Sequence, residues 1–298
     1  MLITVGAALA QTLRTAGQKH LTARLSVWSV TWVRFVFGLP FAVLYLVWAT
    51  ERSAHQFPTL QASFLVPAAA AAICQILATI FLVYLFSLRN FAVGTTYART
   101  ETVLTAIVGT LLFTEVVGTA GWLAILVSVA GVLIVSMVKS GLTGWALLRS
   151  TWNLSAGVGL ASGLLFAFSS LFIRKASLSF GIDDKPFAAA ITLVTVVGVQ
   201  TALLGLYILA RQAKELPEIM RAWRPCLFVG LTSALGSMGW FTAMSMQHAS
   251  YVKALGQIEF LFALGVSIVF FREKSTGREL AGMALTAAGI AILLLATD

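Results

Sequence analysis

Two stretches of the sequence decide the fold: ETVLTAIVGTLLFTE at residues 101–115 and EFLFALGVSIVFFRE at residues 259–273. Each is mainly apolar between two glutamates, and one shift of 158 residues carries Glu101 onto Glu259 and Glu115 onto Glu273. Apolar similarity between membrane spans is common. In a chain with only 11 acidic residues, it is uncommon for one shift to align two glutamates with two other glutamates. The two stretches therefore indicate an internal repeat.

The same shift aligns further features outward from these stretches. Residues 84–92 fall over residues 242–250, and the gaps between apolar segments also match. We therefore predict two five-helix repeats, residues 1–138 and 154–298, joined by a connecting loop at 139–153. Because five is odd, the second repeat must enter the membrane from the opposite side. An inverted repeat of this kind is typical of secondary transporters.

Composition indicates an all-α polytopic membrane protein. Apolar residues make up 59% of the 298 positions, charged residues 10%, and the mean hydropathy is +0.93. Soluble domains carry roughly 25% charged residues, so this chain lacks the polar surface of a soluble fold. Ten transmembrane helices of about 20 residues each leave no room for a soluble domain. We predict them at residues 2–20, 28–49, 64–87, 91–113, 119–138, 154–174, 186–210, 226–246, 250–271 and 279–296.

Charge and cysteine content narrow the functional classes. The net charge of +9 fits basic residues in loops beside membrane helices, and no basic stripe with interleaved aromatics predicts nucleic-acid binding. Cys74 and Cys226 lie in apolar runs and suggest small buried side chains. We expect no cofactor and no metal site. Gly38 and Pro40 predict a kink in the second helix.

The chain resembles the drug/metabolite transporter superfamily, specifically the EamA type with ten helices in two repeats. In the second half the resemblance is carried by Gln257-Ile258-Glu259-Phe260, Phe270-Phe271-Arg272-Glu273-Lys274 and Gly282 to Gly289. In the first half it is carried by Arg99-Thr100-Glu101-Thr102, Phe113-Thr114-Glu115 and Gly131. The chain departs from the family at Thr102 and Phe260, where a proline is usual. The resemblance implies a carrier of amino acids, nucleosides or related metabolites, with export favoured, in the plasma (inner) membrane of a bacterium.

Glu101 and Glu259 are the strongest candidates for a functional site. Each lies near the middle of a predicted span, where an acidic side chain costs about 2.5–3.5 kcal/mol on insertion scales. Such a residue should face the interior and pair with another group. One interpretation is proton exchange during transport. The other is that each glutamate is a fixed structural partner of an arginine or of helix-end amides.

Three cations in the predicted spans have two possible roles. Lys253, Arg14 and Arg34 could extend from near a helix end to the membrane interface. If two or more point inward, the cavity is cationic and the substrate carries a carboxylate or phosphate. The first helix is polar for a lipid-exposed span, so we expect it to line a cavity or to pack inside.

Four further residues complete the set of candidates for a substrate or coupling-ion site. Tyr97 lies four residues before Glu101 and should share its helix face, whereas Arg99 lies two before it and should point elsewhere. Gln75 and Gln257 are either polar lining groups or interhelical hydrogen-bond partners.

Small residues predict close packing of the fifth helix on the tenth. Ala124 and Gly131 on one, and Gly282 and Gly289 on the other, are each two turns apart. A homodimer seam is the alternative use of such a strip, so both a monomer and a homodimer remain open.

Orientation and function have alternatives. Connections after the odd-numbered helices carry most of the lysine and arginine, which places both termini outside the cytoplasm, whereas the family resemblance favours termini inside. For function, we predict a secondary carrier of a small molecule across the lipid bilayer. The alternatives are an intramembrane enzyme, for which no nucleophile motif or metal-spaced cluster is present, and a non-transporting scaffold.

Overall fold

The computed structural model describes residues 2–86, 88, 98–139, 141, 154–259 and 276–297. In this part of the chain every regular element is helical. The elements are α1 (Leu2–Leu21), α2 (Val27–Val36), α3 (Leu39–Arg52), α4 (Ala62–Leu85), α6 (Glu101–Leu112), α7 (Thr119–Lys139), α9 (Leu154–Leu178), α10 (Lys185–Arg211), η2 (Ala213–Glu215), α11 (Leu216–Arg221), α12 (Trp223–Met246), α13 (Ala249–Gly256) and α15 (Gly277–Thr297).

The expected helix at residues 28–49 is divided into α2 and α3. Phe37 and Gly38 separate the two pieces, and Pro40 lies in the first turn of α3. Pro40 has no N–H to donate to Val36, so the helical ladder cannot continue through it. Gly38 also lies against α12: a Cβ built on it would be 3.2 Å from the carbonyl oxygen of Gly230. The break therefore comes from proline chemistry and from close backbone packing.

Two other expected helices are interrupted beside the glutamates, and here the prediction of continuous helices over 91–113 and 250–271 is wrong. A turn at residues 99–100 precedes α6, so Glu101 is the first residue of that helix. A turn at Gln257 follows α13, where the Gln257 N–H donates to the Ala254 carbonyl, three residues back, at 3.2 Å. A hydrogen bond between residues three apart is tighter than the four-residue spacing of an α-helix, and here it ends the regular series of helical hydrogen bonds without a proline. Residues 91–97 and 260–271 lie outside the described residues.

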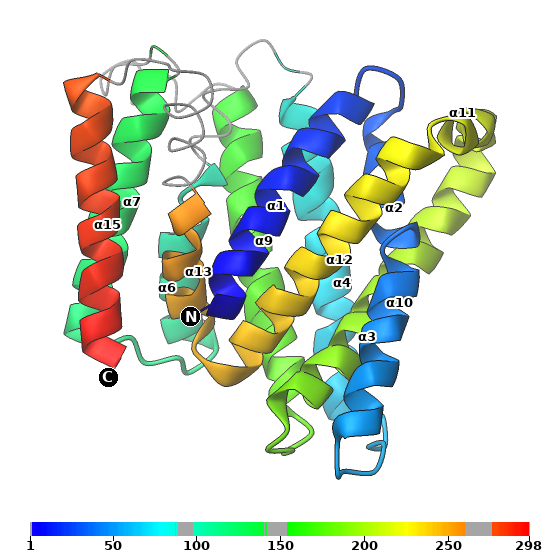
Figure 1. The fold of residues 1–298 in the computed structure, drawn as a ribbon, viewed down its shortest axis with the longest axis horizontal. Coiled ribbons are helices and arrows are strands. Elements are labelled where there is room, and N and C mark those ends of the chain that lie inside the picture. The colour runs from blue at the N-terminus through cyan, green and yellow to red at the C-terminus, as the bar shows by residue number, and fades with distance from the viewer. Residues whose placement is uncertain are drawn as a thin grey trace.

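Helices from the two halves of the sequence pack together. α1 lies along α12, α4 along α9, and α7 along α15. Figure 1 shows that α1 and α7 run toward the end of the bundle at the top of the view, whereas α9 and α15 run away from it. The N and C labels both lie in the lower half of the view, beside the ends of α1 and α15.

The contact between α7 and α15 is close along the strip of small residues. A Cβ built on Gly131 would be 2.5 Å from the carbonyl oxygen of Gly282, and one on Gly289 would be 2.8 Å from that of Ala124. Backbone atoms occupy the space that side chains would need. The structure thus places the small residues of both helices face to face within one chain.

The outer surface is apolar, as expected of an integral membrane protein. Large apolar side chains are exposed on several helices, among them Leu44, Val66, Leu126 and Leu206. Among the described residues, six segments are long and apolar enough to cross a membrane: Val27–Arg52, Ala62–Leu85, Thr119–Val138, Leu154–Leu178, Lys185–Arg211 and Trp223–Met246.

Candidate functional site

A cavity of about 280 Å³ lies between α1, α4, α6, α9, α12 and α13, with α2 and α7 each contributing one residue. Of the nine residues predicted for a substrate or coupling-ion site, the structure brings eight to its wall; Tyr97 lies outside the described residues. The eight are Glu101, Glu259, Lys253, Arg14, Arg34, Arg99, Gln75 and Gln257. The lining reaches Lys19, which is exposed near the end of α1.

Glu259 is paired with Arg99, the cation that helix periodicity predicted to lie on a different side of its helix from Glu101. Its Oε1 accepts from Nη1 of Arg99, and its Oε2 accepts from Nε2 of Gln11 at 3.4 Å. Arg99 was expected on a different side from Glu101, and this is wrong: both line the cavity. The turn at residues 99–100 breaks the 3.6-residue periodicity on which that expectation rested.

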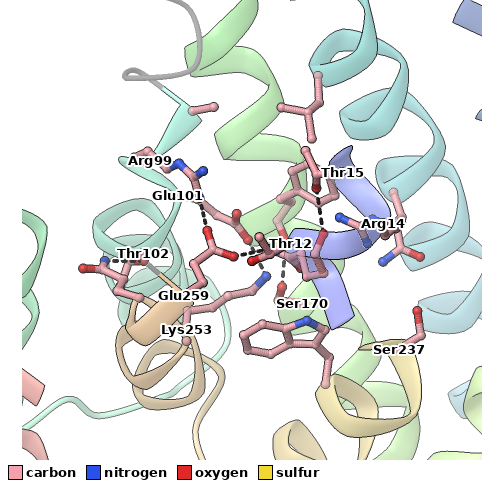
Figure 2. Close-up of a pocket in the computed structure, with 18 of the residues that line it drawn as sticks. Thr12, Arg14, Thr15, Arg99, Glu101, Thr102, Ser170, Ser237, Lys253 and Glu259 are labelled. Atoms are coloured by element: carbon pink, nitrogen blue, oxygen red, sulfur yellow. Dashed lines mark hydrogen bonds and ion pairs between the residues drawn. The ribbon is translucent and has the colours of Figure 1, made fainter. Parts of the chain in front are cut away.

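Glu101 is paired in the same way with a cation from the other half. Lys253 Nζ lies 2.5 Å from Glu101 Oε1, and the Lys253 ammonium also lies 5.0 Å from the ring centroid of Trp240. Glu101 stands in the first turn of α6, where the helix dipole favours a negative charge. Figure 2 shows both ion pairs on one side of the cavity, with Arg14 on the other.

Arg14 and Arg34 point inward instead of extending to a membrane interface. Only 4% of Arg14 and 3% of Arg34 is exposed, and both line the cavity. Arg34 donates from Nε to Ser233 Oγ at 3.0 Å and from Nη1 to Thr79 Oγ1 at 2.7 Å. Arg14 Nε is buried and has no hydrogen-bond partner among the described residues. The polar face of α1 thus supplies cavity wall.

The two glutamines combine both of the roles considered for them. Gln75 accepts from Gln200 Nε2 on α10 at 2.8 Å, and Gln257 Nε2 donates to Thr102 Oγ1 at 2.9 Å. Each therefore joins two helices while lining the cavity.

Aromatic and small polar side chains that were not predicted from the sequence complete the wall. Trp240, Phe166 and Phe241 form aromatic parts of the lining, and Ser170 and Ser237 form polar parts. Small polar residues inside membrane helices tend to face helix contacts. That tendency was the available signal for the serines, whereas no signal separates Trp240 from the other tryptophans.

A second buried charge cluster, also missed from the sequence, lies around Glu115. Its Oε1 is 3.0 Å from Arg174 Nε and accepts from the backbone N–H of Ala249 at 3.3 Å, while its Oε2 accepts from Ser250 Oγ at 3.3 Å. His248 Nδ1 is 3.9 Å from the same carboxylate. These contacts tie the α6–α7 connection to α9 and to the start of α13.

Local backbone geometry directs Glu115 inward. Thr114 has a φ of 55°, an uncommon value for a β-branched residue, and the Glu115 N–H returns to the Gly109 carbonyl at 3.0 Å. Arg174 in turn donates to the carbonyls of Met244 and Gln247 at 2.7 and 2.5 Å, at the end of α12. The signal in the sequence was Glu115 itself, an acidic residue at a repeated helix end.

Comparison with known proteins gives one family and one fold. The model of the EamA-like transporter family matches residues 1–137 and 150–295. Several solved chains match, among them a crystal structure with a TM-score of 0.73 and 14% sequence identity over 99% of this chain and 95% of that one, which shows a shared fold alone. The comparison with curated proteins found no match.

Proposed function

Because the chain belongs to the EamA-like transporter family, whose members are membrane transporters of small molecules rather than enzymes, we propose that it is a secondary active transporter. It carries a small metabolite across a bacterial plasma membrane by alternating access, in the direction of export. Ten spans form two inverted repeats, residues 1–138 and 154–298, which rock about the cavity on either side of the 139–153 connection.

Helix packing supports the inverted repeat. Under the shift of 158 residues, α1 corresponds to α9, α4 to α12, and α7 to α15. The contact of α1 with α12 is thereby the counterpart of the contact of α4 with α9. Corresponding helices run in opposite directions in Figure 1, as an inverted repeat requires.

The observation that carries the proposal is the pair of interrupted helices at the cavity. The turn at residues 99–100 corresponds to the turn at Gln257 under the same shift, and each is followed by a cavity-lining glutamate. Discontinuous helices at the interface of two repeats form the substrate and ion sites of many secondary transporters. A scaffold has no need for buried charges at both equivalent positions, each of which costs energy.

Both ion pairs at the cavity connect the two halves, which supports a site that changes when the halves move. Arg99 of the first half pairs with Glu259 of the second, and Lys253 of the second pairs with Glu101 of the first. A rocking motion alters the distances within these pairs. A glutamate that loses its cation in a low-dielectric site favours its protonated form, so Glu259 is our candidate for proton coupling.

Counterflow in proteoliposomes tests this proposal. Vesicles holding the full chain are loaded with unlabelled amino acids, nucleosides or organic acids, and uptake of a trace of the labelled compound is followed. We expect one class to accumulate transiently. Glu259→Gln should retain counterflow but lose uptake driven by a pH gradient, while Glu51→Gln, at an exposed acid, should retain both. No accumulation of any class beyond that in protein-free vesicles contradicts the carrier.

A further inference from the structure

We propose, building on the transport function above, that the cavity recognises its substrate by an oxyanion group, a carboxylate or a phosphate, held between Arg14 and Arg34. The substrate is thus a small organic anion. Both guanidinium groups lie on the wall of the same cavity, and both residues are almost fully buried. An anion between them is attracted by both positive charges.

Arg14 has unused binding capacity. Its Nε is buried without a hydrogen-bond partner, and in the described part of the chain no carboxylate forms an ion pair with it. The charges of Glu259 and Glu101 act on it only at longer range, since each is engaged by a nearer cation. A buried charge without a direct partner is costly, and a bound anion offsets that cost.

Within the described ranges, only neutral groups accept hydrogen bonds from Arg34. Ser233 and Thr79 accept its hydrogen bonds, and they fix the guanidinium without neutralising it. Thr79 also donates to the Gln75 carbonyl on the same helix at 2.8 Å, which fixes the acceptor in turn. The fork of an arginine matches the two oxygens of a carboxylate or phosphate.

The charges of the whole lining favour an anion over a cation or a neutral solute. Among the described residues, five basic side chains line the cavity, against the two acids Glu101 and Glu259; the five are Lys19, Arg14, Arg34, Arg99 and Lys253. Clefts lined by one sign of charge concentrate ligands of the opposite sign. Trp240 Nε1, a further buried donor with no hydrogen-bond partner in the described part of the chain, also belongs to the lining.

Cavity size limits the substrate to a small metabolite. A volume of about 280 Å³ is below the roughly 300–1,000 Å³ of sites for drug-sized ligands. Such a space fits a short-chain acid or a phosphorylated three-carbon compound.

Equilibrium binding to the purified full chain tests the proposal without requiring transport. Matched probe pairs are compared by thermal shift and titration: succinate against succinamide, and glycerol phosphate against glycerol. We expect at least one anion to raise the melting temperature while its neutral counterpart does not. Comparing succinate with glycerol phosphate shows whether the cavity prefers a carboxylate or a phosphate.

Variants locate the binding site. Arg14→Gln and Arg34→Gln should each weaken binding of the effective anion about 10- to 100-fold, the usual effect of removing a charge-assisted hydrogen bond. Arg24→Gln removes the same charge from an exposed loop position and should leave the affinity unchanged. Arg14→Lys and Arg34→Lys keep the positive charge but lose the paired N–H donors of the guanidinium. Each should bind the anion with an affinity between those of the wild type and the glutamine variant. They provide the test where a glutamine variant does not fold.

Three results would overturn the proposal: equal effects of the neutral and anionic probes, no effect of any anion on the wild type, or unaltered affinity in the arginine variants. None of these results contradicts the proposal that the chain is a transporter. Counterflow of a neutral or cationic compound alongside any of them would leave a carrier with a different substrate class.

Discussion

The Glu115 cluster gives a prediction whose size follows from the structure. Glu115→Gln keeps the shape of the side chain and removes its charge. In the native chain 6% of the Glu115 side chain and 17% of the Arg174 side chain are exposed. Breaking a fully buried pair costs about 3–5 kcal/mol, and a hydrogen bond to a charged group contributes about 1.5–3 kcal/mol.

The expected cost lies below the upper limit for two reasons. Glutamine can still accept a hydrogen bond from Arg174, and Arg174 retains two backbone carbonyls as acceptors. We therefore expect a loss of about 2–3 kcal/mol, or roughly 4–6 °C in the melting temperature at about 2 °C per kcal/mol for a chain of this size.

Thermal unfolding of the purified protein in detergent measures this effect. The matched control is Glu218→Gln, because the partly exposed Glu218 pairs with the exposed Arg221 at 3.8 Å. Ion pairs at the protein surface contribute about 0–1 kcal/mol. If Glu115→Gln melts within about 1 °C of Glu218→Gln, the cluster does not hold the helices together and the reasoning is refuted.

Two further predictions concern packing and the cavity ion pairs. Gly131→Ala should destabilise the chain by about 1–3 kcal/mol, because the new Cβ meets the backbone of α15. The control Gly198→Ala has nothing within 4 Å of its new Cβ, so in unfolding experiments it should be neutral or stabilising by up to about 1 kcal/mol. Equal melting temperatures of the two variants would contradict the close α7–α15 contact. Lys253→Met should lower stability by about 2 kcal/mol, and adding Glu101→Gln should recover at least half of that loss, since the second change removes an unpaired buried charge. A double variant whose loss is the sum of the two single losses argues against direct coupling of the pair.

Much of the helical framework was accessible from local sequence. Apolar runs marked α1, α4, α7, α10 and α12 closely, because membrane helices must satisfy their backbone internally and need a minimum apolar length. The kink at Gly38 followed from the missing N–H of Pro40. The inward position of Glu101 and Glu259 followed from the cost of exposing a charge to lipid, whereas for Lys253, Arg14 and Arg34 the sequence left two roles open.

The site details depended on contacts that local sequence does not encode. The breaks at residues 99–100 and at Gln257 have no proline to mark them, and once a helix is interrupted its periodicity no longer predicts which side a residue faces. The partner of each glutamate comes from the other half of the chain, so it depends on how the halves dock. Glu115 had a clear repeat signal, but its partners Arg174 and His248 became apparent only from the packing.

Access to the cavity from the two sides of the membrane tests the central claim most directly. Thr12, a partly exposed cavity residue, is replaced by cysteine in a background with Cys74→Ala and Cys226→Ala, and Ser128→Cys, buried outside the cavity, serves as the control. A membrane-impermeant thiol reagent is applied to membrane vesicles of opposite orientation.

Alternating access predicts that the Thr12→Cys thiol reacts from one side only in the resting protein. It should also react from the opposite side when Glu115→Gln weakens the cluster that ties α9 to the end of α12 and the start of α13, while the control reacts from neither. Reaction from a single side in both proteins, unchanged by the effective substrate, would contradict a carrier that exposes one site to both sides in turn.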